Sequence, residues 1–194
     1  DPYLLTNYII RATTGVVNTA NGNGPQSAKM TRAAAQSIPT GGSANKIAFD
    51  TEEYDVGDIA DSTTNDRFNI KKSGKYLVSA SLEIANMDSG EWLQVYIYKN
   101  GASVHDDFTY GVPTDGWLNV NAVTTLDLVA GDYLEMYVFQ NEGVAQNTIT
   151  GTQSQPKMSV VQLDTTGNAT TLQGAYDMGR LISTTDARDI TITL

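Results

Sequence analysis

The 194-residue sequence contains no cysteine and a single histidine. The lack of cysteine excludes disulfides, thiolate nucleophiles and cysteine-ligated zinc. Lysine and arginine total 12 against 22 acidic residues, for a net charge of −10, so the surface would repel a phosphate backbone and we expect no nucleic-acid binding. No run of about 18 apolar residues occurs, and the first residues lack the order of a signal peptide, so we expect no membrane insertion.

What the sequence does contain is a pattern of strands and turns. Apolar residues alternate with polar ones through Arg67–Ile84, and a Ser73-Gly74 pair interrupts the alternation. Period-two alternation places alternate side chains on one face of a sheet, so this stretch predicts two strands joined by a tight turn. Gly74 is expected to take a backbone conformation that a Cβ disfavours. The expected core residues are Phe68, Ile70, Tyr76, Val78, Ala80, Leu82 and Ile84.

Further short apolar runs are separated by glycine, asparagine and aspartate pairs. We predict strands at 47–49, 92–98, 117–128, 133–139 and 158–163. The Asn100-Gly101 pair follows an alternating run and is a strong hairpin signal. The acidic stretch 50–66 and the segment 102–116 are expected to be loops. Many short antiparallel strands with frequent turns predict an all-β sandwich or jelly roll.

Composition changes divide the chain into three parts. Residues 1–30 combine a short apolar run with a Gly/Asn-rich linker that ends near Gln26; we predict either an attachment segment or a strand added to the main sheet. Residues 31–163 form the main domain. In residues 164–194, a capping box at Thr170–Gln173 predicts a short helix and the alternation at 189–194 predicts a strand, which together suggest one unit of a stalk.

Four motifs in the main domain resemble the C1q-like family and occur in the order typical of that family. They are the apolar-Phe-Asp run ending at Asp50, the F-x-x-x-x-x-G-x-Y run from Phe68 to Tyr76, the Asn-Gly hairpin and the Leu-x-Leu-x-x-Gly-Asp run ending near Leu134. The residues that carry the resemblance are Phe49, Phe68, Gly74, Tyr76, Asn100, Gly101, Gly131 and Asp132. The resemblance implies a C1q/TNF-like antiparallel jelly roll that assembles as a homotrimer.

Other segments resemble the C1q-like modules of bacteriophage structural proteins. These are residues 36–39, 49–55 and 74–78, while residues 172–177 resemble a stalk segment of phage and bacterial fibre proteins. This resemblance implies a non-enzymatic virion protein, either a head or tail fibre or a capsid decoration, that contributes to host-surface attachment. Other virion proteins would bind through 1–30 or 164–194, and a host glycan or protein would be the outer partner. The alternative is a secreted C1q-like module that recognises glycans or proteins.

The sequence identifies no catalytic, cofactor-binding or metal-ligating residue. Seven acidic residues between Asp50 and Asp66 could supply oxygens to Ca²⁺, although a solvated loop is the commoner outcome and no D-x-D-x-D-G loop is present. His105-Asp106-Asp107 could mimic part of a catalytic dyad, but no G-x-S-x-G nucleophile elbow occurs and a surface position is expected.

Aromatic residues are the remaining candidates for ligand contact. Trp92 and Trp117 begin predicted strands, so we expect both to pack inside the domain or at a subunit contact. Phe108 and Tyr110 lie among aspartates, a combination that proteins often use to hold sugars. We predict Tyr110 to be a possible surface-binding residue in an exposed loop.

Overall fold

The computed structural model describes residues 25–111 and 116–163, and within these ranges every regular element is a β-strand. The strands are β1 (Ser27–Thr31), β2 (Ser37–Ile38), β3 (Asn45–Lys46), β4 (Thr51–Val56), β5 (Ala60–Asp61), β6 (Arg67–Asn69), β7 (Gly74–Met87), β8 (Trp92–Lys99), β9 (Ala102–Tyr110), β10 (Gly116–Leu128), β11 (Tyr133–Gln140), β12 (Gln146–Asn147) and β13 (Lys157–Gln162).

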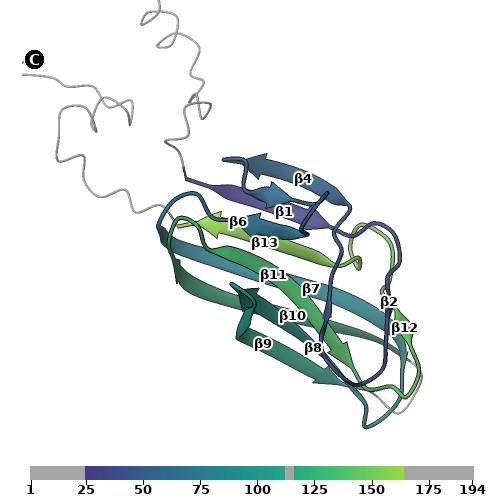
Figure 1. Ribbon diagram of the computed structural model, residues 1–194. Coiled ribbons are helices and arrows are strands. Elements are labelled where there is room, and N and C mark those ends of the chain that lie inside the picture. The colour runs from purple at the N-terminus through teal and green to yellow at the C-terminus, as the bar shows by residue number, and fades with distance from the viewer. Residues whose placement is uncertain (1–24, 112–115, 164–194) are drawn as a thin grey trace, which may run out of the picture. The chain divides into compact units, whose positions relative to one another are not determined.

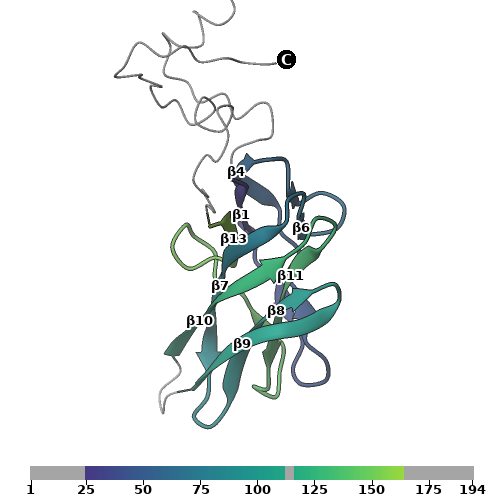
Figure 2. The ribbon, with the colours of Figure 1, turned by 90° about the vertical axis from the view of Figure 1, so that its left-hand side faces the viewer.

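The strands form two antiparallel sheets that pack face to face (Figures 1 and 2). One sheet is five-stranded in the order β10-β7-β13-β1-β4. The other is six-stranded: β5-β6-β11-β8-β9, with β3 also paired to β11. A short β12–β2 pair lies at one end. Strands distant in sequence are neighbours, as in a jelly roll, so the predicted all-β fold class is confirmed.

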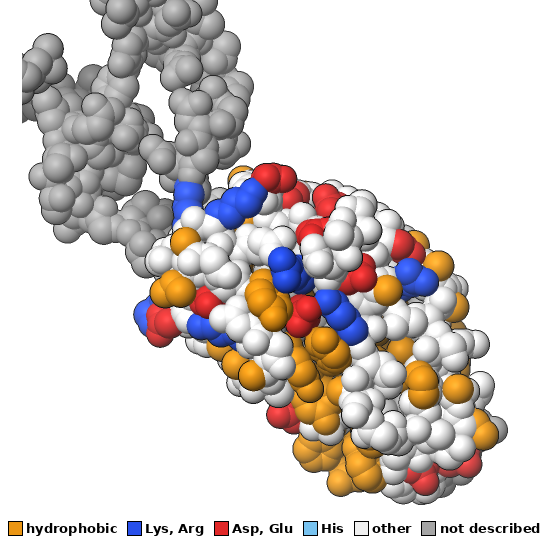
Figure 3. Space-filling model, in the orientation of Figure 1, with side chains coloured by type: hydrophobic (Ala, Val, Ile, Leu, Met, Phe, Trp, Pro, Cys, Tyr) orange, Lys and Arg blue, Asp and Glu red, His pale blue; other side chains and the backbone are white. Residues whose placement is uncertain are grey.

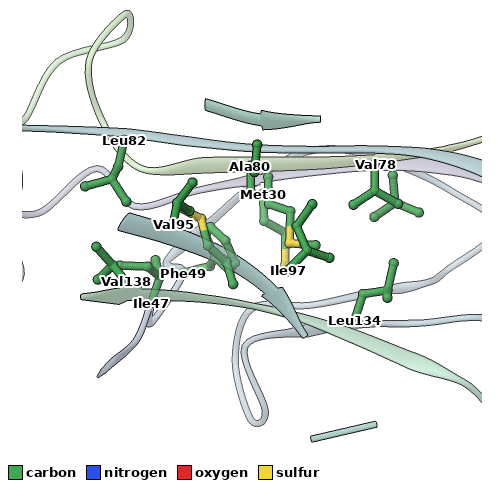
Figure 4. Close-up of a cluster of buried hydrophobic side chains, with 14 of the residues drawn as sticks. Met30, Ile47, Phe49, Val78, Ala80, Leu82, Val95, Ile97, Leu134 and Val138 are labelled. Carbon is green, nitrogen blue, oxygen red and sulfur yellow. The ribbon is translucent and has the colours of Figure 1, made fainter. Parts of the chain in front are cut away.

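The core lies between the sheets and is built by the predicted alternation. Along β7, every second side chain from Tyr76 to Ile84 is buried, and β8 and β11 contribute inward-facing residues from the other sheet. Figure 4 shows side chains from both layers meeting, including Val78, Leu82, Val95, Ile97 and Val138. Burial of these apolar groups, at about 25 cal/mol per Å², is the main favourable term in folding.

The turn at Ser73-Gly74 does not close a hairpin. β6 pairs with β5 and β11 in the six-stranded sheet, whereas β7 pairs with β10 and β13 in the other sheet. The two strands predicted between Arg67 and Ile84 therefore exist, but the turn carries the chain from one layer to the other. Alternation reports which face is buried, and it cannot report which partner strand is adjacent.

The main domain begins earlier than residue 31. Strand β1 lies inside the five-stranded sheet between β13 and β4, so residues 27–30 belong to the domain and not to the preceding segment. Gln26, which the sequence analysis placed at the end of an exposed linker, is buried at 2% exposure. Its backbone and side chain bond to β13 and to the β6–β7 turn, so the linker prediction is wrong at this residue.

Three strands, β4, β5 and β9, occupy segments that the sequence analysis assigned to loops. Strand β4 crosses the acidic stretch and β9 follows the Asn-Gly turn; both lie at sheet edges. Their side chains are exposed on both faces along much of their length, which removes the alternation on which strand prediction depends. At 47–49 the reverse holds: Ile47 and Phe49 are buried as expected, but the strand there is limited to Asn45–Lys46.

Two predicted parts lie outside the described residues. They are the attachment segment up to residue 24 and the stalk helix and strand in 164–194. Within the described part of the chain, no helix is long and apolar enough to cross a membrane.

Candidate functional site

Three aromatic residues that carry the family resemblance lie in the core. Phe68 and Tyr76 are fully buried and Phe49 is 2% exposed. The Tyr76 hydroxyl lies 2.9 Å from Gln26 Oε1 and 2.7 Å from the Lys72 carbonyl oxygen, both of which accept hydrogen bonds. Burial raises the pKa of Tyr76 to about 12. These residues hold the two layers together and are not placed to contact a ligand.

The turn residues of the resemblance form a second structural unit. Asn100 and Gly101 have φ angles of 53° and 81° and join β8 to β9, which confirms the hairpin signal. Gly131, with φ of 100°, lies in the turn between β10 and β11. Left-handed φ angles of this kind favour Gly and Asn, so the sequence specifies both turns directly.

Asp132 links these two turns. Its carboxylate accepts hydrogen bonds from Asn100 Nδ2 at 2.7 Å and from the Val129 N–H at 2.8 Å, and it pairs with Lys99 Nζ at 2.9 Å. Burial raises the pKa of Asp132, but the bonds from Lys99, Val129 and Asn100 outweigh burial and hold the pKa below its usual value. The Asn100 side chain also accepts a bond from the Tyr133 N–H. The Asp132 carboxylate therefore has a structural role, which is to hold the two turns together.

Gly74 has a different role from the predicted one. It begins β7 without a positive φ, so the expectation of a conformation that excludes a Cβ is wrong. A Cβ at this position would lie 2.8 Å from Gln162 Nε2. That atom is the end of a flexible side chain, so a residue larger than glycine would require Gln162 to shift.

The acidic stretch does not assemble a metal site among the described residues, where no group of three or more histidine or acidic side chains converges. The carboxylates instead accept local hydrogen bonds. Asp55 accepts from the N–H groups of Ile59 and Ala60, and Asp61 accepts from Asn65 Nδ2 at 2.7 Å. These bonds fix the path of the chain between β4 and β6.

The histidine and its two aspartates lie along β9 and do not form a dyad. Asp106 lies opposite Tyr96, whereas His105 and Asp107 lie opposite Ile97 and Val95. Neighbouring residues of a strand point to opposite faces, so Asp106 and His105 are separated by the sheet itself, and no hydrogen bond or ion pair joins His105 to Asp107 on the shared face within the described residues. Among the described residues this segment has no arrangement of nucleophile and base.

The aromatic candidates lie at two separate places. Tyr110 ends strand β9, so its assignment to a loop is wrong, although it is 59% exposed. Phe108 is 51% exposed and meets Tyr110 edge-to-face, with ring centroids 5.5 Å apart. Trp92 is partly covered and stacks on Phe139 at 5.7 Å. Trp117 is 65% exposed on the outer side of the five-stranded sheet, beside an open depression of about 390 Å³.

The structure gathers further aromatic residues that the sequence analysis did not single out. Half of the chain's 4 Phe, 2 Trp and 10 Tyr point outward from the six-stranded sheet. We call this surface the aromatic face, and Figure 3 shows it as a band of hydrophobic side chains over β8, β9 and β11. Its members are Trp92, Tyr96, Tyr98, Phe108, Tyr110, Tyr133, Tyr137 and Phe139. The sequence contains a pattern that indicates this face, because in β8 and β11 aromatic residues occupy most of the positions between the buried ones.

No protein-family model matches the chain. Over 105 residues, half of the chain, it is 35% identical to a protein of Bacillus subtilis (strain 168) described as the phage-like element PBSX protein XkdV. The match spans 15% of the length of that relative.

Similar solved structures share the fold at low sequence identity. The crystal structure of murine APRIL has a TM-score of 0.54 at 11% identity and covers 72% of this chain and all of that one. The globular domain of zebrafish complement 1qA protein has a TM-score of 0.51 at 14% identity, over 72% of this chain and 98% of that one. The Eiger TNF of S. frugiperda has a TM-score of 0.53 at 14% identity, over 76% and 99%. The chain therefore has the C1q/TNF-type jelly-roll fold, and half of it is similar to a phage-element protein.

Proposed function

We propose that this chain is a non-enzymatic structural protein of a phage particle, and that it assembles as a homotrimer in a fibre or decoration that contributes to host attachment. The observation that carries the proposal is the 35% identity to a phage-element protein over half of the chain. The C1q/TNF-type fold supports it because the resemblance to C1q-like modules implies a trimer. The secreted recognition module is the alternative, and its expected location would be extracellular.

The outer face of the five-stranded sheet is the surface we assign to the trimer contact. Its central rows place Thr125, Leu77 and Val161 side by side, and next to them Val123, Ser79 and Ser159. We call these six residues the small-residue face. Ser79 Oγ and Ser159 Oγ hydrogen-bond to each other at 2.8 Å, so the two hydroxyls are paired within the chain.

The small-residue face suits close contact between copies. It carries no charged side chain at its centre, and the ion pairs Lys75–Asp127 and Lys29–Glu53 lie toward its margins. Small side chains on a sheet form a flat surface that another copy can approach closely, and charge is depleted at the centre of protein interfaces. Leu77 and Val123 remain 39% and 48% exposed in a single chain, so burial by neighbouring copies would remove apolar surface from water.

The flanking parts have separate roles in the proposal. Residues 1–30, apart from the portion of β1 that they contain, attach the domain to other virion proteins, and residues 164–194 begin a stalk. The jelly roll between them is the part that carries surface-exposed recognition residues.

Two measurements test the proposal. Sedimentation velocity at micromolar concentration should give a species of three times the 20.9 kDa chain mass. Antibodies raised against the chain should label purified phage particles of the source strain in electron micrographs. A stable single chain at micromolar concentration contradicts the trimer, and particles without label contradict the virion location.

A further inference from the structure

The aromatic face has two ends that differ in how much of their side chains is exposed to solvent. At one end, Tyr98 stacks on Tyr137 with ring centroids 4.2 Å apart, and the Arg67 guanidinium lies over the Tyr133 ring at 4.6 Å. Glu135 pairs there with Lys46. Rings and charges at this end contact one another, and Tyr98, Tyr133 and Tyr137 are partly buried.

The rings of the other end also contact one another, since Trp92 stacks on Phe139 and Phe108 meets Tyr110 edge-to-face, but this end is more exposed to solvent. We call it the β8–β9 patch, and the strand register places its residues in three facing pairs. The pairs are Trp92 with Tyr110, Gln94 with Phe108, and Tyr96 with Asp106. All six point to the outer side of the sheet because alternate residues of a strand share a face. Phe108 and Tyr110 lie on the edge strand and are more than half exposed.

Polar groups are inserted between these rings. Gln94 Nε2 donates a hydrogen bond to Asp106 Oδ2 at 2.7 Å, which fixes the orientation of both side chains between the Phe108 and Tyr96 rings. An ionised carboxylate offers about four acceptor positions and a primary amide two donors, so this bond uses a minority of their capacity. The patch therefore presents aromatic rings beside an oriented carboxylate and amide.

We propose that the β8–β9 patch binds a neutral glycan chain of the host surface. This inference rests on the proposed attachment function and names its ligand class. A pyranose ring has an apolar C–H face that packs on an aromatic ring, and hydroxyl groups at its rim that donate to a carboxylate and accept from an amide. The patch supplies both kinds of partner within three residue pairs.

Charge selects a neutral glycan over an anionic one. The chain carries a net charge of −10, and the charged side chain within the patch is Asp106. A phosphorylated or sulfated polymer would therefore be repelled, both at long range and at the contact itself. The same carboxylate argues against a second copy of the chain as the occupant, since packing two such patches together would bury Asp106 beside another copy of itself.

The experiment uses the full chain on an array of neutral oligosaccharides built from hexoses and N-acetylhexosamines, with phosphorylated and sulfated oligosaccharides printed beside them. The wild type should bind at least one neutral glycan and no anionic one. Phe108→Ala and Tyr110→Ala should each lower the apparent affinity for that glycan at least tenfold, and Asp106→Ala should lower it severalfold. Val144→Ala is the matched control, because Val144 is 61% exposed in a loop outside the patch and should bind as the wild type does.

The proposal is overturned if no neutral glycan on the array binds, if anionic glycans bind more tightly, or if Phe108→Ala and Tyr110→Ala bind as the control does. Sedimentation velocity of each variant separates this failure from that of the proposed function. A trimer that labels phage particles but binds no neutral glycan leaves the structural role intact and removes only the glycan site. A wild type that sediments as a single chain contradicts the proposed assembly, and the array result then decides the glycan site independently.

Discussion

The two outward faces of the sandwich differ in chemistry, although both are built by the same alternation. The outer face of the six-stranded sheet carries half of the chain's aromatic residues, with Gln94 and Asp106 between them. The central rows of the outer face of the five-stranded sheet carry serine, threonine, leucine and valine, with ion pairs around them and Trp117 at one end of β10. Each of these surfaces extends across three strands, so the difference does not depend on a single strand.

We infer from this difference that the two faces serve the two different partners proposed above. Projecting aromatic rings with interleaved polar groups match a ligand that has its own hydroxyls, whereas a flat surface of small side chains matches a copy of the same chain. The core between the two sheets is apolar throughout, so it does not determine which partner either outer face binds. Substitutions on the two faces, and in the core that separates them, can therefore be compared within one protein.

The largest effect is expected from a charge placed on each face. In a single chain Val123 is 48% exposed and Phe108 is 51% exposed, so the two positions are matched in exposure. Val123→Asp should dissociate the trimer, because each carboxylate would be buried without a partner at a cost of about 3–5 kcal/mol. Phe108→Asp should leave the sedimentation coefficient unchanged. If both variants sediment as single chains, or both as trimers, the assignment of the two faces is wrong.

A core substitution between the faces should have the next largest effect. Tyr76→Ala removes a fully buried ring whose hydroxyl is bonded to Gln26 and Lys72, and should lower the free energy of unfolding by about 3–5 kcal/mol. Leu77→Ala, on the next residue and the opposite side of β7, should cost less than about 1 kcal/mol in the dissociated chain. Urea denaturation of both variants measures the difference. Equal costs would mean that the inward side of β7 has been misassigned.

Alkaline pH should separate the core tyrosine from the outer ones. Tyr76 has a pKa of about 12 in the folded chain, so its contribution is complete below the unfolded value near 10 and is lost as the pH rises through 12. Raising the pKa of this hydroxyl from about 10 to about 12 corresponds to about 3 kcal/mol of stability. Burial also raises the pKa of Tyr96 and Tyr137, which adds to the loss. Tyr76→Phe, measured by urea denaturation at pH 9 and 11.5, should lose less stability between these two pH values than the wild type does.

The smallest effect concerns the two ends of the aromatic face. Tyr98→Ala breaks the 4.2 Å stack with Tyr137 and should cost about 1–2 kcal/mol, of which the ring pair supplies about 0.5–1.5. Tyr110→Ala removes a side chain that is 59% exposed and should cost under about 1 kcal/mol. Thermal unfolding of the two variants measures both. A larger loss for Tyr110→Ala would mean that the β8–β9 patch is part of the structural frame.

The sequence predicted what alternation and turn chemistry control. The buried side of β7, the Asn100-Gly101 hairpin and the all-β class follow from local patterns of two to ten residues. Strands β4 and β9 were missed because side chains at sheet edges are exposed on both faces, so burial leaves no period in the sequence. Gln26 was missed because a buried polar residue is identified by its partners, and these lie at Tyr76, the 71–72 turn and Gln162.

The candidate site could be predicted only in fragments. Tyr110 was singled out for its aspartate neighbours, but Gln94 and Asp106 become one unit only when β8 and β9 pair in a fixed register. The Asn-Gly turn indicated that pairing, and the absence of alternation in 102–110 concealed it. The outward position of Trp117 likewise depends on which face of β10 meets the core. Trp117 is 65% exposed, so it does not pack inside the domain, and its predicted place at a subunit contact stays a prediction.

The neighbouring positions of β1 and β13 have a consequence for how such a module is carried in a longer polypeptide. Ser27, in the first strand, lies opposite Val161, in the last, so the chain enters and leaves the domain at adjacent points within the five-stranded sheet. A module whose two ends are neighbours can be inserted into, or removed from, a host sequence without separating the segments on either side. Recombination could thus exchange the whole jelly roll, with both of its outward faces, as a single cassette.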